Sequence, residues 1–239
     1  MPNLLVEIGN TALKAAYSEG LTLGKTFRYQ GEKTTGFILT LIEKEQRPKV
    51  LLIASMREVS ESERHLFAQS CQTLIVLDPV SRDLLSNYSL PKHLSYDRAA
   101  AIIAARRMFP GKSAALFDFG TIMSVDFIGS DGAYKGGYLS PGCRTRFKSM
   151  NRYSKSLPLV NTPNGCSAVE NSLQADMEKG VIKGMLFEIE GHLKSAPEVT
   201  VFTGGDAAYF ADRAENPVFV VSNLVMMGLA SIIEDYANE

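Results

Sequence analysis

The stretch Val6-Glu7-Ile8-Gly9-Asn10-Thr11 decides the fold, because a close copy, Phe117-Asp118-Phe119-Gly120-Thr121, stands near the middle of the chain. In both, an acid lies among apolar residues and a glycine turn with a threonine follows. The apolar run predicts a buried strand, and the acid at its end can hold Mg²⁺ or its water shell. Glycine lets backbone N–H groups turn toward phosphate oxygens. One copy is a weak signal, but two copies in opposite halves predict a nucleotide held between related halves.

The composition is that of a globular protein with a small-molecule partner. The chain has 239 residues, of which 45% are hydrophobic and 21% charged, so it can form one large domain or two small ones. Its net charge is −1, and the basic residues are spread along the sequence. A basic run at 144–155 is interpreted as a helix beside a cleft for an anionic substrate. We therefore expect no nucleic acid and no membrane partner.

The cysteines and the first residues indicate the compartment. Cys71, Cys143 and Cys166 are odd in number and lack CxxC spacing, which argues against a disulfide framework and a structural zinc site. The residues after Met1 contain no basic segment and reach Glu7 before any signal-length apolar run. No apolar stretch approaches the length of a transmembrane helix. The sequence predicts reduced thiols and a cytoplasmic protein.

The two halves repeat one order of elements. In the first half, hydrophobic spacing and turn residues predict a meander and then alternating helices and strands. Expected strands there are 4–8, 13–17, 21–29, 50–54 and 73–77, and expected helices are 34–45, 60–69 and 97–108. The helix at 60–69 starts with Ser60 and Glu63 at capping-box spacing.

The second half repeats the order after Phe109-Pro110-Gly111-Lys112, where proline and glycine break the preceding helix. Expected strands are 113–119, 122–128, 133–139 and 199–202, and helices are expected after Pro141-Gly142, at 180–193 and at 223–236. We therefore predict an α/β protein of two related lobes, 1–110 and 111–239. A hinged cleft between lobes suits a kinase, because closure excludes water from the transferring phosphoryl group.

The ordered motifs resemble those of the type III pantothenate kinases, a family of the acetate and sugar kinase, Hsp70 and actin superfamily. The family's first phosphate turn, Asp-x-Gly-Asn-Thr-x-x-Lys, corresponds to Glu7–Lys14. Its substrate motif, Gly-x-Asp-Arg after an upstream tyrosine, corresponds to Ser95–Arg98 after Tyr88. Its second phosphate turn corresponds to Asp118–Asp126, and its later Thr-Gly-Gly to Thr203–Gly205. Each motif alone is weak, but the ordered set covers most of the chain.

The resemblance implies a fold, a reaction and a set of partners. The fold is a pair of ribonuclease H-like lobes, the actin-like ATPase fold, with a nucleotide cleft between them. The reaction is transfer of the γ-phosphoryl group of ATP to the primary hydroxyl of pantothenate, the first step of coenzyme A biosynthesis. The implied cofactors are Mg²⁺ and a monovalent cation, K⁺ or NH₄⁺. The resemblance also implies a homodimer whose substrate pocket borrows from the partner chain.

The resemblance also implies roles for individual residues. Asp97 is expected to be the general base, and Arg98 to bind the substrate carboxylate with its planar fork of donors. The expected substrate-binding residues are Tyr88, Ser95, Tyr96, Arg98 and Ser172. The expected nucleotide-binding residues are Glu7, Gly9, Asn10, Thr11, Lys14, Gly120, Thr121, Gly204 and Gly205. Glu7 and Asp118 are the expected Mg²⁺ ligands.

Several positions depart from the family pattern. Glu7 replaces aspartate and adds a methylene to a ligand of a metal with strict distances. Ser95 replaces glycine, which matters if that position needs a positive φ. Ile122 and Ser124 replace alanine and threonine in the second turn, and Ser172 is one residue away from the family's hydroxyl position. Two alternatives stay open: a non-catalytic accessory relative, in the sense of the family's name Bvg accessory factor, and a kinase for another small polyol or acid.

Overall fold

The computed structural model describes residues 1–81, 83–160 and 172–237, and it contains two five-stranded sheets with the same strand order. The first sheet has the order β3-β2-β1-β4-β5. β1 pairs with β2, and β2 with β3, in antiparallel fashion, while β4 and β5 continue the sheet in parallel from β1. Its strands are β1 (Asn3–Ile8), β2 (Leu13–Glu19), β3 (Thr22–Tyr29), β4 (Val50–Ser55) and β5 (Thr73–Leu77).

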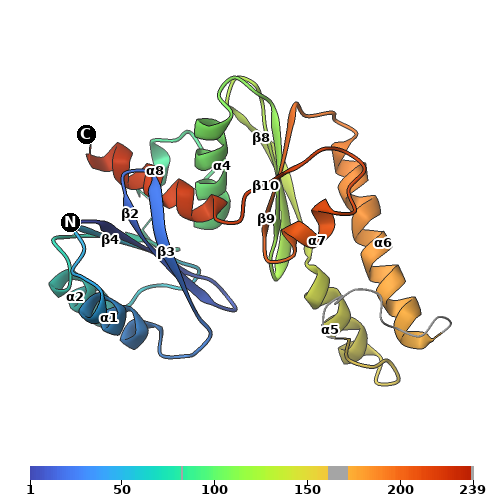
Figure 1. The fold of residues 1–239 in the computed structure, drawn as a ribbon, viewed down its shortest axis with the longest axis horizontal. Coiled ribbons are helices and arrows are strands. Elements are labelled where there is room, and N and C mark those ends of the chain that lie inside the picture. Colours follow the sequence, from blue (N-terminus) through green and yellow to red (C-terminus); the bar gives the residue numbers. More distant parts are fainter. Residues whose placement is uncertain (82, 161–171, 238–239) are drawn as a thin grey trace. The chain divides into compact units, whose positions relative to one another are not determined.

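Helices lie on both faces of this sheet (Figure 1). The apolar side chains of alternate β1 residues, Leu4, Val6 and Ile8, pack with residues of α1 and α2. Because side chains alternate along a strand, Glu7 lies on the opposite face, on the side of α4 and α8. The predicted capping box at Ser60 and Glu63 is confirmed. The helices are α1 (Thr34–Lys44), α2 (Glu61–Gln69), α3 (Asp83–Ser86), α4 (Tyr96–Met108) and α8 (Leu224–Ala237).

The C-terminal helix α8 belongs with the first sheet. By internal packing the chain divides into Met1–Met108 with Asn223–Glu239, and Phe109–Ser222. A Cβ atom at Gly228 of α8 would lie 1.9 Å from the backbone oxygen of Ala100 in α4, so only glycine allows this close approach of the two helices. The predicted lobe boundary at 110/111 stays a prediction. The two divisions differ in the terminal helix, which the sequence prediction assigned to the second lobe and the packing assigns to the first unit.

The second sheet has the order β10-β9-β6-β7-β8, which is the order of the first sheet read from its other edge. β6 pairs with β7, and β7 with β8, in antiparallel fashion, while β9 and β10 continue in parallel from β6. The predicted repetition of one architecture is therefore confirmed. The strands are β6 (Ala114–Phe119), β7 (Ile122–Ile128), β8 (Tyr134–Pro141), β9 (Val199–Gly204) and β10 (Phe219–Val220).

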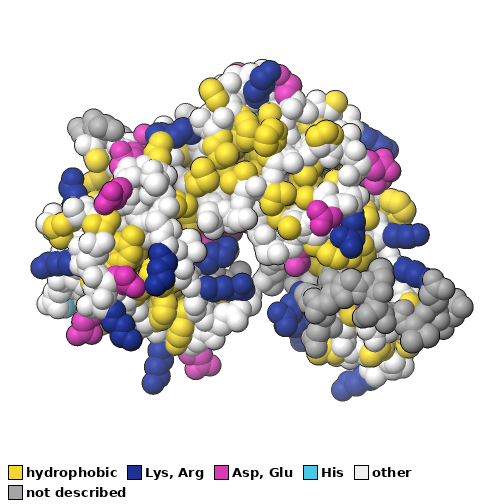
Figure 2. All heavy atoms as spheres, in the orientation of Figure 1, with side chains coloured by type: hydrophobic (Ala, Val, Ile, Leu, Met, Phe, Trp, Pro, Cys, Tyr) yellow, Lys and Arg dark blue, Asp and Glu magenta, His cyan; other side chains and the backbone are white. Residues whose placement is uncertain are grey.

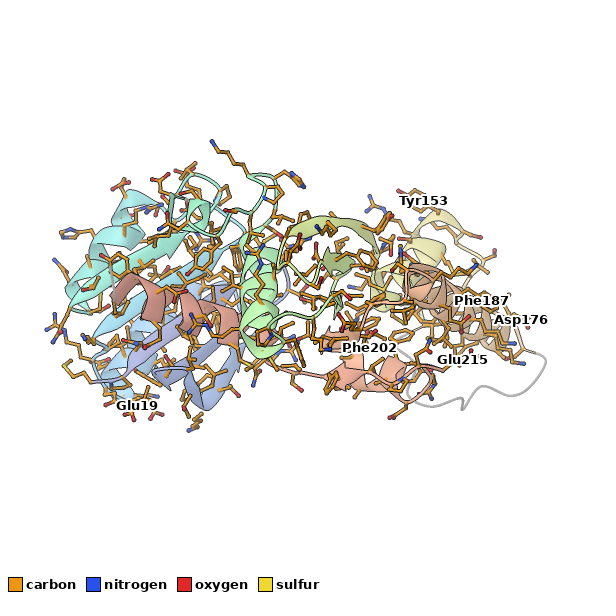
Figure 3. The ribbon with its side chains drawn as sticks, turned by 90° about the horizontal axis from the view of Figure 1, so that it is seen from above. Glu19, Tyr153, Asp176, Phe187, Phe202 and Glu215 are labelled. Carbon is orange, nitrogen blue, oxygen red and sulfur yellow. The ribbon has the colours of Figure 1, made fainter. Side chains whose placement is uncertain are left out.

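The helices of the second unit, α5 (Cys143–Tyr153), α6 (Leu173–Leu193) and α7 (Ala207–Ala211), lie on one side of its sheet (Figure 1). Beneath them, Phe202 is fully buried, and its ring packs against Phe117 and Phe119 at centroid distances of 5.2 and 4.9 Å (Figure 3). Aromatic edge-to-face pairs of this kind strengthen a core beyond their buried area. The carboxyl ends of β6 and β9 are therefore supported by a well-packed aromatic core.

The strands agree with the sequence predictions more closely than the helix ends do. α6 begins seven residues before the predicted start at 180, because Ser172 caps it by accepting the N–H of Ala175 at 3.2 Å. The short elements α3, α7 and β10 were not predicted. Cys71 and Cys143 are free and buried, and Cys166 lies outside the described residues.

Charge of both signs is spread over the visible face of each unit (Figure 2). This agrees with the net charge of −1. Among the residues that the structure describes, no helix combines the length and apolar character needed to cross a bilayer.

Candidate active site

Glu7 is a buried carboxylate at the end of β1. Its side chain is 14% exposed, and it stands opposite Lys14 in the β1–β2 ladder, with the Lys14 Nζ atom 3.8 Å from Oε2. Glu7 Oε2 is buried and has no hydrogen-bond partner among the described residues. Burial raises the pKa of Glu7, the charge of Lys14 lowers it, and the charge of Asp97 raises it further. A buried carboxylate oxygen without a hydrogen bond is chemically suited to coordinate a cation.

The turn after β1 is tight and leaves two polar residues exposed. The N–H of Gly9 donates to the carbonyl of Ala12 at 3.1 Å, and a Cβ at Gly9 would lie 3.3 Å from that same oxygen. Asn10 and Thr11 at its tip are exposed. The turn therefore presents backbone and side-chain donors of the kind that bind phosphate.

α4 brings Asp97 to the same strand end. The hydroxyl of the buried Tyr96 donates to the carbonyl of Ile8, the last residue of β1, at 3.2 Å. Asp97 follows in the first turn of α4, and its carboxylate accepts the backbone N–H of Arg98 at 2.9 Å. The structure thus groups Glu7, Lys14, Tyr96 and Asp97 within one unit. Tyr96 itself is held in the core, where it sets the position of the α4 start.

Ser95 adopts an ordinary backbone conformation. Among the described non-glycine residues, positive φ occurs at Ser89 and Ala196. The carbonyl of Ser95 accepts the N–H of Ala99, which starts the hydrogen-bond ladder of α4. The loss of the family's glycine at this position therefore causes no left-handed strain.

Tyr88 is tied to the other end of α4. Its carbonyl accepts from Arg106 Nη1 at 2.8 Å, and its hydroxyl donates to Asp235 Oδ2 of α8 at 2.8 Å. Arg106 belongs to the last turn of α4, whereas Asp97 belongs to the first. The loop before α4 therefore runs alongside the helix, with Tyr88 anchored at one end and Ser95 at the other.

In the second unit, Asp118 lies at the carboxyl end of β6 against a glycine. In the ladders it stands opposite Ser124 of β7 and Thr203 of β9. Gly204 has φ +90°, and a Cβ there would lie 2.4 Å from Asp118 Oδ1 and 2.6 Å from the nitrogen of Phe119. The N–H of Gly205 donates to the carbonyl of Phe119 at 3.1 Å. Asp118 and the Gly204-Gly205 turn therefore lie side by side.

Gly204→Ala is expected to destabilise this unit by about 1–3 kcal/mol, because the new Cβ meets backbone and would require a left-handed conformation. Gly205→Ala is the matched control, since its added Cβ meets nothing within 4 Å and its φ is ordinary. Thermal unfolding of the two variants measures the difference. Equal melting temperatures would contradict the assigned geometry of the turn.

The second phosphate turn, Gly120-Thr121, is packed against the start of α5. The carbonyl of Thr121 accepts from the N–H of Gly142 at 3.1 Å and from the Thr145 hydroxyl at 2.6 Å. A Cβ at Gly142 would lie 2.0 Å from the oxygen of Gly120, so this approach also requires glycine. The Pro141-Gly142 segment of the sequence thus serves to hold the turn in place.

Sequence reasoning missed Asp206, which follows the Gly204-Gly205 pair. Burial raises the pKa of Asp206, and Arg144 lowers it. Burial, with Asp206 as the next cause, also raises the pKa of the Cys143 thiol to about 12, so this thiol stays protonated and unreactive. An acid directly after Thr-Gly-Gly was visible in the sequence, but nothing in its spacing pointed to a neighbour in α5.

Ser172 is the N-cap of α6, and it was the only predicted substrate residue in the second unit. No contact described for it reaches the other predicted residues, so its substrate role stays a prediction. The nearby hydroxyl residues at 162–171 lie outside the described residues. Nor do the described residues contain a cluster of three or more His, Cys, Asp or Glu side chains that could hold a metal alone.

Comparison with known proteins places these features in a family. The family model described as type III pantothenate kinase matches residues 3–195. A curated relative from Phocaeicola vulgatus, named type III pantothenate kinase, is 34% identical over 237 residues, which are 97% of each chain. The residues matched by the family model include the turn after Glu7, the whole of α4 and the turn after Asp118.

Solved structures with the same fold have lower identity. A Campylobacter jejuni protein described as a Baf family transcriptional activator is 22% identical with a TM-score of 0.64, covering 99% of this chain and all of its own. The activator of 2-hydroxyisocaproyl-CoA dehydratase from Clostridium difficile, solved with bound ADPNP, is 13% identical with a TM-score of 0.58. It covers all of this chain and 98% of its own. These likenesses show the predicted actin-like ATPase fold.

Proposed function

The chain belongs to the type III pantothenate kinase family, and from this premise we propose the roles of its site residues. Its reaction is the ATP-dependent phosphorylation of pantothenate, the first step of coenzyme A biosynthesis. The observation that carries the proposal is the joint placement of Asp97 and the buried Glu7 at the end of β1. No finding favours the non-catalytic alternative, and the family match favours pantothenate over another acceptor.

Asp97 orients the acceptor and takes its proton. The primary hydroxyl of pantothenate attacks the γ-phosphorus of ATP, the bond from that phosphorus to the bridging oxygen breaks, and ADP leaves. The hydroxyl proton passes to the Asp97 carboxylate. Because the transition state of phosphoryl transfer is loose, this transfer comes late, and positioning supplies most of the acceleration.

The other substrate contacts follow the loop before α4. Arg98 pairs with the pantothenate carboxylate through its fork of donors. Tyr88 adds a phenolic contact, and Ser95 lines the start of α4. Tyr96 contributes by fixing the position of Asp97, since its hydroxyl is bonded to the end of β1. Ser172 is proposed as a further substrate contact, supported only by its place in the sequence.

The two turns bind the phosphates of ATP. Asn10, Thr11 and the backbone of Gly9 supply donors from the first turn, and Lys14 supplies a positive charge. Gly120 and Thr121 do the same in the second turn. Gly204 and Gly205 serve the adenosine side, where the lack of a side chain permits close contact.

Glu7 and Asp118 are each suited to coordinate Mg²⁺. The buried Oε2 of Glu7, which has no hydrogen bond among the described residues, is a hard oxygen whose desolvation a metal cation would offset. Mg²⁺ is commonly bound by one or two carboxylates plus phosphate oxygens, so a third protein ligand is not required. When bound, Mg²⁺ neutralises charge that develops on the phosphoryl oxygens. We also propose K⁺ or NH₄⁺ as a monovalent cofactor and a homodimer, which rest on the family resemblance. The proposed cytoplasmic location rests on the cysteine pattern and the first residues of the sequence.

The proposal is tested by following ADP release with ATP, Mg²⁺ and pantothenate, with and without K⁺ or NH₄⁺. We expect release that requires pantothenate and increases with one of these cations. Sedimentation of the same sample measures the oligomeric state. Pantothenate-dependent release without any cation effect would remove the monovalent ion from the proposal and leave the kinase.

A further inference from the structure

We propose that Asp235, in the last helix of the chain, is a positioning residue for substrate binding: it holds the hydroxyl of Tyr88 in place. The inference rests on the proposed role of Tyr88 in binding pantothenate. Asp235 lies outside residues 3–195, which the family model matches, and the phosphate and substrate motifs of the sequence do not include it. Through Asp235, α8 would contribute to a substrate site whose other proposed residues in this unit come from β1, α4 and the loop before α4.

The first observation is a chain of contacts that ends at Tyr88. Its phenolic hydroxyl donates to Asp235 Oδ2 at 2.8 Å, and Arg107 Nη2 donates to Asp235 Oδ1 at 2.6 Å. One carboxylate oxygen is therefore fixed by the guanidinium, and the other accepts the only proton of the phenol. Asp235 consequently fixes both the position of the ring and the direction of the hydroxyl proton.

The second observation is that the backbone at Tyr88 needs such support. Ser89, the next residue, has φ +53°, which L residues adopt rarely. The N–H of Ser89 donates to the Ser86 carbonyl at 3.3 Å, and Arg106 donates to the Tyr88 carbonyl at 2.8 Å. Arg106 Nε is buried without a hydrogen-bond partner among the described residues, and burial lowers the pKa of this guanidinium. The strained backbone at Ser89 and the buried guanidinium of Arg106 thus both lie next to Tyr88, a residue of the substrate motif.

The third observation argues for a functional rather than a structural role of Asp235. The side chains of Arg107 and Asp235 are 40% and 38% exposed. Ion pairs this exposed contribute little to stability, because water screens them and side-chain entropy opposes them. α8 is held instead by its buried face and by the close approach of Gly228 to Ala100. Removal of the Asp235 carboxylate should leave α8 folded and free the Tyr88 hydroxyl.

The test compares steady-state kinetics of Asp235→Ala, Asp235→Asn, Tyr88→Phe and the double variant Tyr88→Phe/Asp235→Ala. Tyr236→Phe, which removes an exposed hydroxyl from the neighbouring position of α8, is the control. Asp235→Ala is expected to raise the KM for pantothenate about three- to tenfold, the loss of one hydrogen bond, with the KM for ATP unchanged. Asp235→Asn should recover part of this loss, because its amide oxygen can still accept the phenolic proton, whereas its NH₂ group cannot accept from Arg107. In the Tyr88→Phe background, Asp235→Ala should have no further effect.

The outcomes separate this inference from the proposed function. A raised KM for pantothenate in Tyr88→Phe but not in Asp235→Ala would overturn the role of Asp235 and leave that of Tyr88. An unchanged KM in Tyr88→Phe would remove Tyr88 from the proposed site, and this inference with it. Equal losses from Asp235→Ala with and without the Tyr88 hydroxyl would show a structural effect and overturn the inference. If the alanine variant does not fold, Asp235→Asn and Asp235→Glu are compared on the same readouts.

Discussion

Asp97→Asn is expected to lower the rate of pantothenate-dependent ADP release by about 10²–10⁴-fold, the usual contribution of a positioned general base. The carboxylate lies in the first turn of α4, which Tyr96 ties to the end of β1, so the base has a fixed position. Asparagine keeps the size of the side chain and an oxygen that can accept the Arg98 N–H. The loss should therefore come from the missing base and not from a change of fold.

Asp176→Asn is the matched control for this variant. Asp176 is also an aspartate in the first turn of a helix, α6, and it is exposed. Both variants lose the same favourable interaction of an acid with a helix N-terminus. We expect Asp176→Asn to keep full activity. An Asp97→Asn protein with nearly normal kcat would contradict the assignment of the base.

Glu7→Gln is expected to lower kcat/KM for ATP by about 10- to 100-fold without lowering the stability of the fold. The activity falls because an amide is a poorer ligand for Mg²⁺ than a carboxylate. Stability is kept because the buried Oε2 has no hydrogen bond, and Lys14 at 3.8 Å offsets only part of the cost of burying the charge. Chemical unfolding and kinetics at varied Mg²⁺ measure the two effects on one protein.

The pH dependence of stability gives a second readout for Glu7. Burial, opposed by Lys14 and assisted by Asp97, raises the pKa of Glu7 above its ordinary value of 4.5. Between that value and the raised pKa, the folded chain binds a proton that the unfolded chain releases. Stability is therefore lost as pH rises through this window. Glu7→Gln should remove this loss, and Asp97→Asn should reduce it by lowering the pKa of Glu7.

Asp78→Asn is the matched control among buried carboxylates. Asp78 is fully buried in its side chain, and its oxygens accept from Arg64 and from the backbone N–H groups of Val59, Val80 and Ser81. Burial raises the pKa of Asp78, but these donors outweigh it, so the pKa lies below the ordinary value. Its stabilising contribution is present above the ordinary value and lost as pH falls through the lowered pKa. Asp78→Asn should destabilise the protein by about 1–3 kcal/mol, whereas Glu7→Gln should not.

Much of the fold could be predicted because its strands are short apolar runs. The run at 50–54 is buried on both faces, and the observed β4 ends one residue later. The start of α6 was missed because Gly180 suggested a boundary, while the helix actually begins seven residues earlier, at Leu173, after the Ser172 cap. A glycine inside a long helix costs little when the helix face packs against a core.

The residues of the candidate site could be predicted where they are neighbours within one sequence motif. They could not be predicted where they depend on contacts between residues far apart in the sequence. The turns at Gly9 and Gly120 stand beside their acids in the sequence, so their grouping follows from the strand ends. The contact of Tyr88 with Asp235 joins residues 147 positions apart, and no spacing rule connects them. The close approach of Gly228 to Ala100 is equally invisible, because it depends on how two helices cross.

The most direct test of the central claim is transfer of the labelled γ-phosphoryl group of ATP to pantothenate by the purified protein. The product is separated, and nuclear magnetic resonance determines which hydroxyl of pantothenate carries the phosphate. The account predicts a phosphate ester on the primary hydroxyl of pantothenate, formed by the natural protein and not by Asp97→Asn. A folded protein that binds ATP and forms no such ester would contradict it.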